Sequence, residues 1–161
     1  MSDMPAGAAA AERPTNLTFA INMQYVKDLS FENPRAPQVF AAGQGAPQVQ
    51  VNVDVGAKQF GENVYEITLI LNAQAKSGED TVFVVELTYA GLFTVPPLPP
   101  EQLRPLLLIE CPRLLFPFAR AVVAEATRDG GFPPLMINPI DFAALYRRQA
   151  EAAAAPAAGT A

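Results

Sequence analysis

The sequence predicts an α+β fold, in which a four-stranded antiparallel sheet carries a long helix packed on one face and is followed by a short C-terminal helix. Three observations support this prediction. Apolar and polar residues alternate over four segments between residues 17 and 93, as they do in strands with one buried face. Most of these segments follow one another through short polar turns, which favours antiparallel pairing. Apolar residues at helical spacing dominate the chain after residue 101.

The first predicted strand, residues 17–31, has apolar side chains at its odd positions and mostly polar ones at its even positions. Lys27 interrupts the odd series, and a charge at that point indicates a bend or bulge. Residues 33–47 contain several prolines and glycines, so we interpret them as a long loop. Loops of this length inside a compact domain usually cross over another element or bind a partner.

Three further strands follow this loop. Residues 48–59 alternate valines with polar side chains, and a turn leads into a long hairpin with arms at residues 64–75 and 81–93. Each arm is about twice the usual strand length, so the sheet is large or extends beyond one subunit. The even positions then form a largely acidic outer face, with only Lys58 of opposite charge. Its acidic members are Asp28, Glu32, Asp54, Glu66 and Glu86.

Two helical segments are predicted after the proline-rich residues 95–100, over residues 101–110 and 112–128. Pro112 suits a first helical position, whereas Pro117 lies one turn inside and should kink the helix or tighten its first turn. Apolar side chains occupy more than one side of the second segment.

Local signals mark the C-terminal end of the fold. Gly130 and Gly131 end the long helical region, and no lysine and hydroxyl of a phosphate-binding loop follow them. Asp141 caps a short final helix, in which apolar side chains share one face.

The composition narrows the functional classes. With 16 acidic and 11 basic residues the formal net charge is −5, which argues against nucleic acid or an anionic membrane as the partner. The chain shows neither a secretory signal nor an apolar run of roughly 18 residues, so we expect a cytosolic protein without direct membrane insertion. Residues 1–15 and 150–161 are mostly Ala, Pro, Gly and Thr with few large apolar side chains, and we expect disordered tails around one domain at residues 16–149.

Little in the sequence points to catalysis. One cysteine and no histidine remove disulfides, Cys-pair metal sites and the commonest general base. Asp28 and Glu32 could form a catalytic pair, but residues four apart on a strand are separated by about 13 Å, which favours a solvated or partner-facing surface. Cys111 is interpreted as a small apolar residue rather than as a nucleophile. We therefore expect no enzymatic activity, no metal and no cofactor.

Several separated blocks of the sequence resemble the SecB-type protein-export chaperones of Gram-negative bacteria. The match covers about residues 17–149, with all predicted elements in order. Its spacing is specific, because several blocks at matching distances are hard to obtain by chance. The blocks are residues 25–37 (YVKDLSFENPRAP), 64–66 (VYE), 111–120 (CPRLLFPFAR), 131–133 (GFP) and 138–146 (NPIDFAALY).

The resemblance implies a homotetramer, a dimer of dimers, that holds unfolded precursor proteins without ATP and delivers them to the translocation ATPase SecA. It places the SecA contact on the outer sheet face, at Asp28, Glu32, Val84 and Glu86. The oligomer interface combines three assembly-sensitive strand positions with two residues of the long apolar helix. They are Val85, Leu87, Tyr89, Leu114 and Phe118.

A chaperone that holds unfolded chains needs an aromatic groove with a mobile wall, because such chains expose apolar side chains and free backbone groups. We expect this groove beneath the final helix. Its predicted lining is Phe40, Phe132, Phe142, Leu145 and Tyr146. Composition alone leaves open whether the ten phenylalanines and four tyrosines all lie in the core or partly on the surface.

Two other functions remain open at this point. One is a small sheet enzyme that uses carboxylates, and the other is a purely structural subunit of an oligomer. Suppression of the aggregation of an unfolded precursor, without nucleotide, distinguishes a chaperone from both.

Overall fold

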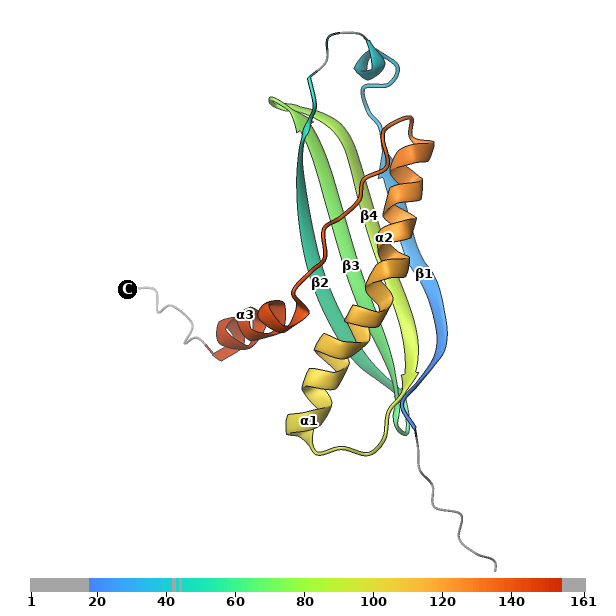
Figure 1. Ribbon diagram of the computed structural model, residues 1–161, viewed down its shortest axis with the longest axis vertical. Helices are drawn as coiled ribbons and strands as arrows, with labels where there is room; N and C mark the ends of the chain where they lie inside the picture. The colour runs from blue at the N-terminus through green and yellow to red at the C-terminus, as the bar shows by residue number, and fades with distance from the viewer. Residues whose placement is uncertain (1–17, 42, 44, 155–161) are drawn as a thin grey trace, which may run out of the picture.

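The computed structural model describes residues 18–41, 43 and 45–154. Figure 1 shows a curved sheet with a long helical run across one face and a second helix beyond one edge of the sheet. The predicted α+β fold is confirmed. No helix in the described ranges is both long and apolar enough to cross a membrane.

The sheet is antiparallel and has the strand order β1-β4-β3-β2, so β1 and β2 form its two edges. The short 3-10 helix η1 (Gln38–Phe40) lies in the loop that crosses from one edge to the other. Each predicted strand is confirmed to within three residues at both ends. The strands are β1 (Ala20–Glu32), β2 (Gln48–Gly61), β3 (Val64–Ser77) and β4 (Asp80–Thr94).

Strand β1 contains two register shifts against β4, at Asn22 and at Lys27. The predicted irregularity at Lys27 is therefore confirmed. Between the two shifts, Met23 and Tyr25 pair with even-numbered residues of β4 and face away from the helices. The prediction that all odd positions of this strand share the apolar face is wrong for these two residues. Each bulge inserts one residue and so inverts the sides on which the following side chains lie.

The core lies between the sheet and the helical layer. Odd-numbered side chains of β3 and β4 point into it and are almost completely buried, among them Ile67, Leu69, Leu71, Val85, Leu87 and Phe93. From the helical side, Leu115 packs above Gly91, where an added Cβ would come within 2.9 Å of the leucine side chain. The absence of a side chain at residue 91 therefore lets the long helix approach the sheet closely.

The long helical run is continuous. It comprises α1 (Pro100–Pro105), the π-helical turn η2 (Leu106–Glu110) and α2 (Cys111–Asp129). The prediction of two separate helices with a start at Pro112 is therefore wrong. The wider π-helical turn lies between Pro105 and Pro112, where missing backbone N–H groups interrupt the regular hydrogen-bond pattern.

The second helix, α3 (Phe142–Ala154), begins where it was predicted. The Asp141 carboxylate accepts a hydrogen bond from the backbone N–H of Ala144 at 3.0 Å, which confirms the predicted cap. The helix continues to Ala154, so the boundary predicted after residue 149 falls inside it. The predicted tail at residues 1–15, and residues 155–161 of the tail predicted at 150–161, lie outside the described residues. An extended segment joins α2 to α3 across the sheet face (Figure 1).

Candidate functional site

The outer face of the sheet, which carries no helix, brings together the four residues at which the resemblance places SecA contact. Asp28 and Glu32 come from β1, and Val84 and Glu86 come from β4. Glu32 lies opposite Val84, and Ser30 lies opposite Glu86. Glu86 is therefore a diagonal neighbour of both β1 carboxylates, a relation that places residues about 7–8 Å apart.

The charged side chains of this group are all acidic. Asp28, Glu32 and Glu86 are exposed, and Val84 among them is half-buried. None of the ion pairs made within residues 18–41 and 45–154 involves the three carboxylates. Like charges close together on a sheet repel one another, and this repulsion is relieved when a cationic partner binds. We call Asp28, Glu32, Val84 and Glu86 the acidic face.

Glu66 was predicted to belong to this acidic outer face, but in the structure its negative charge is balanced by an ion pair with Lys27. The Lys27 ammonium lies 2.8 Å from one Glu66 oxygen, and the Tyr25 hydroxyl donates a hydrogen bond to the other. The hydrogen bonds from Lys27 and then Tyr25 lower the pKa of Glu66. Burial, followed by the bond to Glu66, raises the pKa of Tyr25 to about 12. Sequence reasoning missed this cluster because the register shift at Asn22 turns Tyr25 to the outer face.

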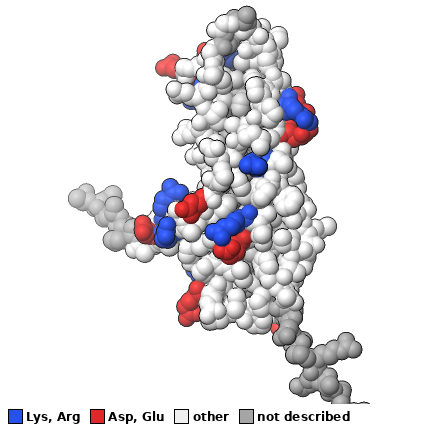
Figure 2. All heavy atoms as spheres, in the orientation of Figure 1, with Lys and Arg blue, Asp and Glu red and all other residues white. Residues whose placement is uncertain are grey.

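The helix-covered face has a different character. In Figure 2, which shows this face, charged side chains form small separate groups within a broad uncharged surface. Near the C-terminal end of α2, four aromatic rings form a continuous chain of contacts. Ring centroids lie 6.0 Å apart between Phe31 and Phe83, 5.0 Å between Phe83 and Phe132, and 5.3 Å between Phe132 and Phe40.

Gly131 lies in close contact with the Phe40 ring, the last ring of this chain of contacts. Its φ is +92°, a conformation that glycine adopts readily, and an added Cβ would come within 2.8 Å of the Phe40 ring. The residue thus ends α2, as predicted, and also makes room for Phe40. The structure confirms that Phe40 and Phe132 lie together.

The predicted link between these rings and α3 is wrong. Phe142 is only 1% exposed and packs edge-on against Phe116 at 6.1 Å, so it fills the space beneath α3 rather than lining an open groove. Leu145 packs against the same core, and Tyr146 is half-buried. Figure 1 shows α3 well separated from η1, which holds Phe40, along the length of the sheet.

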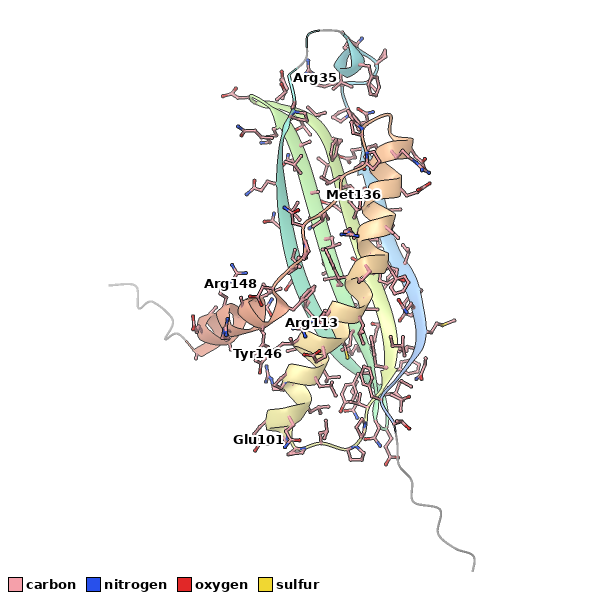
Figure 3. The ribbon with its side chains drawn as sticks, viewed as in Figure 1. Arg35, Glu101, Arg113, Met136, Tyr146 and Arg148 are labelled. Atoms are coloured by element: carbon pink, nitrogen blue, oxygen red, sulfur yellow. The ribbon has the colours of Figure 1, made fainter. Side chains whose placement is uncertain are left out.

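An open apolar groove lies between α3 and the aromatic rings. It has a volume of about 360 Å³ and runs between β2 and the extended segment after α2, on which Met136 is labelled in Figure 3. We call it the β2 groove. Its lining is Val49, Val51, Val53, Leu135, Met136, Ile137, Asn138 and Ile140.

Strand β2 is an edge of the sheet, so the groove also offers backbone N–H and C=O groups that no second strand among the described residues pairs. A second apolar groove of about 340 Å³, lined in part by Val55, Ala57 and Leu107, continues along the same strand. The Gln149 amide donates a hydrogen bond to Asp54 at 3.0 Å, so α3 contacts β2 between the residues that line the two grooves. Periodicity alone could not reveal them, because it assigned the valines of β2 to a closed core.

The residues predicted at the oligomer interface separate into two groups. Val85, Leu87 and Tyr89 lie in the core of one subunit, where they have almost no surface for contact with another chain. Their prediction as direct interface residues is therefore corrected: they position β4 beneath α2. Leu114 and Phe118, in contrast, are exposed on the outer side of α2.

Catalysis gains no support from the described part of the chain. No group of three or more His, Cys, Asp or Glu residues there is arranged to hold a metal ion. Cys111 is buried, and burial together with the nearby Glu110 charge raises the pKa of its thiol to about 12. The thiol is therefore neutral at physiological pH, as expected for a structural residue.

Comparison with known proteins points to one family. A family model described as preprotein translocase subunit SecB matches residues 12–153. A protein-export protein SecB from Rhodospirillum centenum is 53% identical over 143 residues, which cover 88% of this chain and 85% of the relative. A protein of the same name from Maricaulis maris is 53% identical over 156 residues, covering 97% of this chain and 89% of the relative.

A solved structure shares the fold. It is a SecB-like chaperone from Mycobacterium tuberculosis in complex with a ChAD peptide from an antitoxin. The TM-score is 0.63 at 16% sequence identity, and the match covers 76% of this chain and 90% of that chain.

Proposed function

This chain belongs to the SecB family of protein-export chaperones, and from that premise we propose that it holds unfolded precursor proteins in the cytoplasm without ATP and delivers them to SecA. The observation that carries the proposal is the separation of two surfaces. An apolar groove beside an edge strand lies on the helix-covered side, and the acidic face lies on the other side of the sheet. A chaperone with two such surfaces can hold a client and contact a partner at the same time.

The β2 groove suits an unfolded client for two reasons. Its valine, leucine and isoleucine side chains can remove a client's apolar groups from water. The unpaired edge of β2 can form main-chain hydrogen bonds with an extended segment, whatever its sequence. The SecB-like chaperone of similar fold was solved with a bound peptide, which supports a peptide-binding role.

Replacing Val49 by Thr and Met136 by Gln should test this role. The two side chains are 40% and 57% exposed, so the changes make the groove more polar at little expected cost to the free energy of unfolding. We expect a several-fold loss in the suppression of aggregation of an unfolded precursor, measured by light scattering without nucleotide.

Phe60→Ser is the matched control, because Phe60 is 73% exposed and lies outside the groove. It should leave suppression unchanged. Equal losses in both variants would mean that capture depends on exposed apolar surface in general and not on this groove.

Assembly into a tetramer forms part of the proposal. Leu114, Phe118, Ala121 and Val122 follow one another at helical spacing on a side of α2 that the sheet does not cover completely. A groove of about 420 Å³ joins this stripe to Leu29 of β1. Exposed apolar surface that links a helix to an edge strand is typical of contact with another subunit.

Phe118→Glu should break this assembly, because it places a charge in the centre of the proposed apolar contact. Phe118 is 51% exposed within one chain, so the fold itself should tolerate the change. Light scattering at micromolar concentration should show four times the mass of one chain for the parent and a smaller species for the variant. A Phe60→Glu control should retain the parental mass, and an unchanged Phe118→Glu mass would contradict the proposed contact.

The other functions considered have less support. The relatives are named for protein export, and neither name describes an enzyme or a structural subunit. We propose no metal or cofactor, and no nucleic-acid partner.

A further inference from the structure

Neutral amide side chains cover the outer face of β2 and β3 beside the acidic face. Gln50 lies opposite Gln74, and Asn52 lies opposite Asn72. These four residues occupy two adjacent rows of the sheet, because each pair is directly cross-strand. We call them the amide rows.

The amide rows continue directly from the acidic face. A shallow depression of about 170 Å³ is lined by all four amides together with Val84 and Glu86. A second depression, of about 260 Å³, extends it toward the end of the hairpin and includes Gln48 and Lys76. Two of the proposed SecA-contacting residues thus share one concave surface with the amide rows.

The chemistry of the amides differs from that of an ordinary solvated sheet face. An amide side chain can both donate and accept hydrogen bonds, whereas a carboxylate only accepts and an ammonium only donates. Side chains on one face of a strand repeat about every 6.7 Å. Along one edge of an extended peptide, the N–H and C=O groups also recur every two residues, at the same spacing of about 6.7 Å. The amide rows therefore match the main chain of an extended segment.

We propose that the amide rows bind the main chain of an extended, basic segment of SecA, while Glu86 holds one of its cationic side chains. This inference rests on the proposed delivery to SecA and extends its contact surface from four residues to eight. The charge of the acidic face selects a basic segment, and the neutral amides fix its backbone without adding charge.

The Asn72→Val, Gln74→Val double variant tests the inference, because valine retains strand preference but can neither donate nor accept a hydrogen bond. We expect the Kd for purified SecA to rise about tenfold, since each amide contributes the few-fold effect of a neutral hydrogen bond. The rise should be the same at low and high ionic strength. A Glu86→Lys effect should instead shrink as salt screens the charge. Isothermal titration calorimetry across a salt series measures both.

Three control measurements show whether a loss of SecA binding is specific to the amide rows. Gln102→Ala, an exposed amide on α1, should leave SecA binding unchanged. Tetramer mass and aggregation suppression should also stay at parental values in the double variant. If it loses its fold, the equivalent pair Gln50→Val and Asn52→Val on the edge strand replaces it.

Parental SecA affinity in the amide variants, combined with weak binding by Glu86→Lys, would overturn the inference and leave the delivery proposal intact. A parallel loss of client holding would also overturn it, because the amides would then serve clients. If the parent protein itself does not bind SecA, the delivery proposal and the inference both fall.

Discussion

Glu86→Lys is expected to weaken SecA binding by about tenfold or more at low ionic strength. Glu86 lies diagonally between Asp28 and Glu32, and none of the three takes part in an ion pair within the described part of the chain. A lysine at this point would repel a basic partner and would also neutralise the neighbouring carboxylates. Surface plasmon resonance in a salt series should show that the loss is mainly in the association rate and becomes smaller as salt rises.

Glu101→Lys provides the matched control, since it makes the same change of charge on the exposed helix α1 (Figure 3). It should bind SecA as the parent does. Both variants should keep the parental mass and the parental suppression of aggregation, because the acidic face lies away from the β2 groove. Equal SecA affinity of Glu86→Lys and the parent across the salt series would contradict the assignment of the acidic face.

Phe142→Ala is expected to detach α3 from the rest of the fold. The Phe142 ring is nearly completely buried against Phe116, and removing a buried phenylalanine side chain costs about 3–5 kcal/mol. An isolated helix of this length is marginal in water, so α3 should unfold once its anchor is lost. Trypsin should then cleave after Arg147 and Arg148 at least several-fold faster than in the parent, as mass spectrometry of the fragments would show.

Tyr146→Ala is the control for this experiment, because Tyr146 is only half-buried and its loss should change cleavage little. The sheet should remain folded in both variants, as circular dichroism would show. Parental protection of Arg147 and Arg148 in Phe142→Ala would mean that Leu145 and the hydrogen bond between Gln149 and Asp54 hold α3 by themselves.

The same variant also tests how α3 contributes to client binding. Because α3 contacts β2 at Asp54, between the residues that line the two apolar grooves, its release should join them into one longer surface. Aggregation suppression that is retained or increased in Phe142→Ala would agree with a β2 groove that acts independently of α3.

The difference between expected and observed sites has a clear pattern. Asp28, Glu32, Val84 and Glu86 were correctly predicted to share the outer face of the sheet, because they lie in stretches where the alternation is regular. Tyr25 was placed on the wrong face, because the register shift at Asn22 inverts the sides of the residues that follow it. Phe142 and Phe40 were wrongly expected to line one groove because they look alike in sequence, although one is buried and the other exposed.

By itself the sequence determined the four strands, the polar and apolar sides of most of their residues, the cap of α3 and the family. These features follow from local alternation, from single capping residues and from the spacing of motifs. Only the tertiary structure decided the continuity of α1 and α2, the neutral cluster at Glu66, the burial of Phe142 and the open groove along β2. Each of these depends on how residues distant in the chain, or a π-helical turn between two prolines, pack against one another, and no local pattern records that packing.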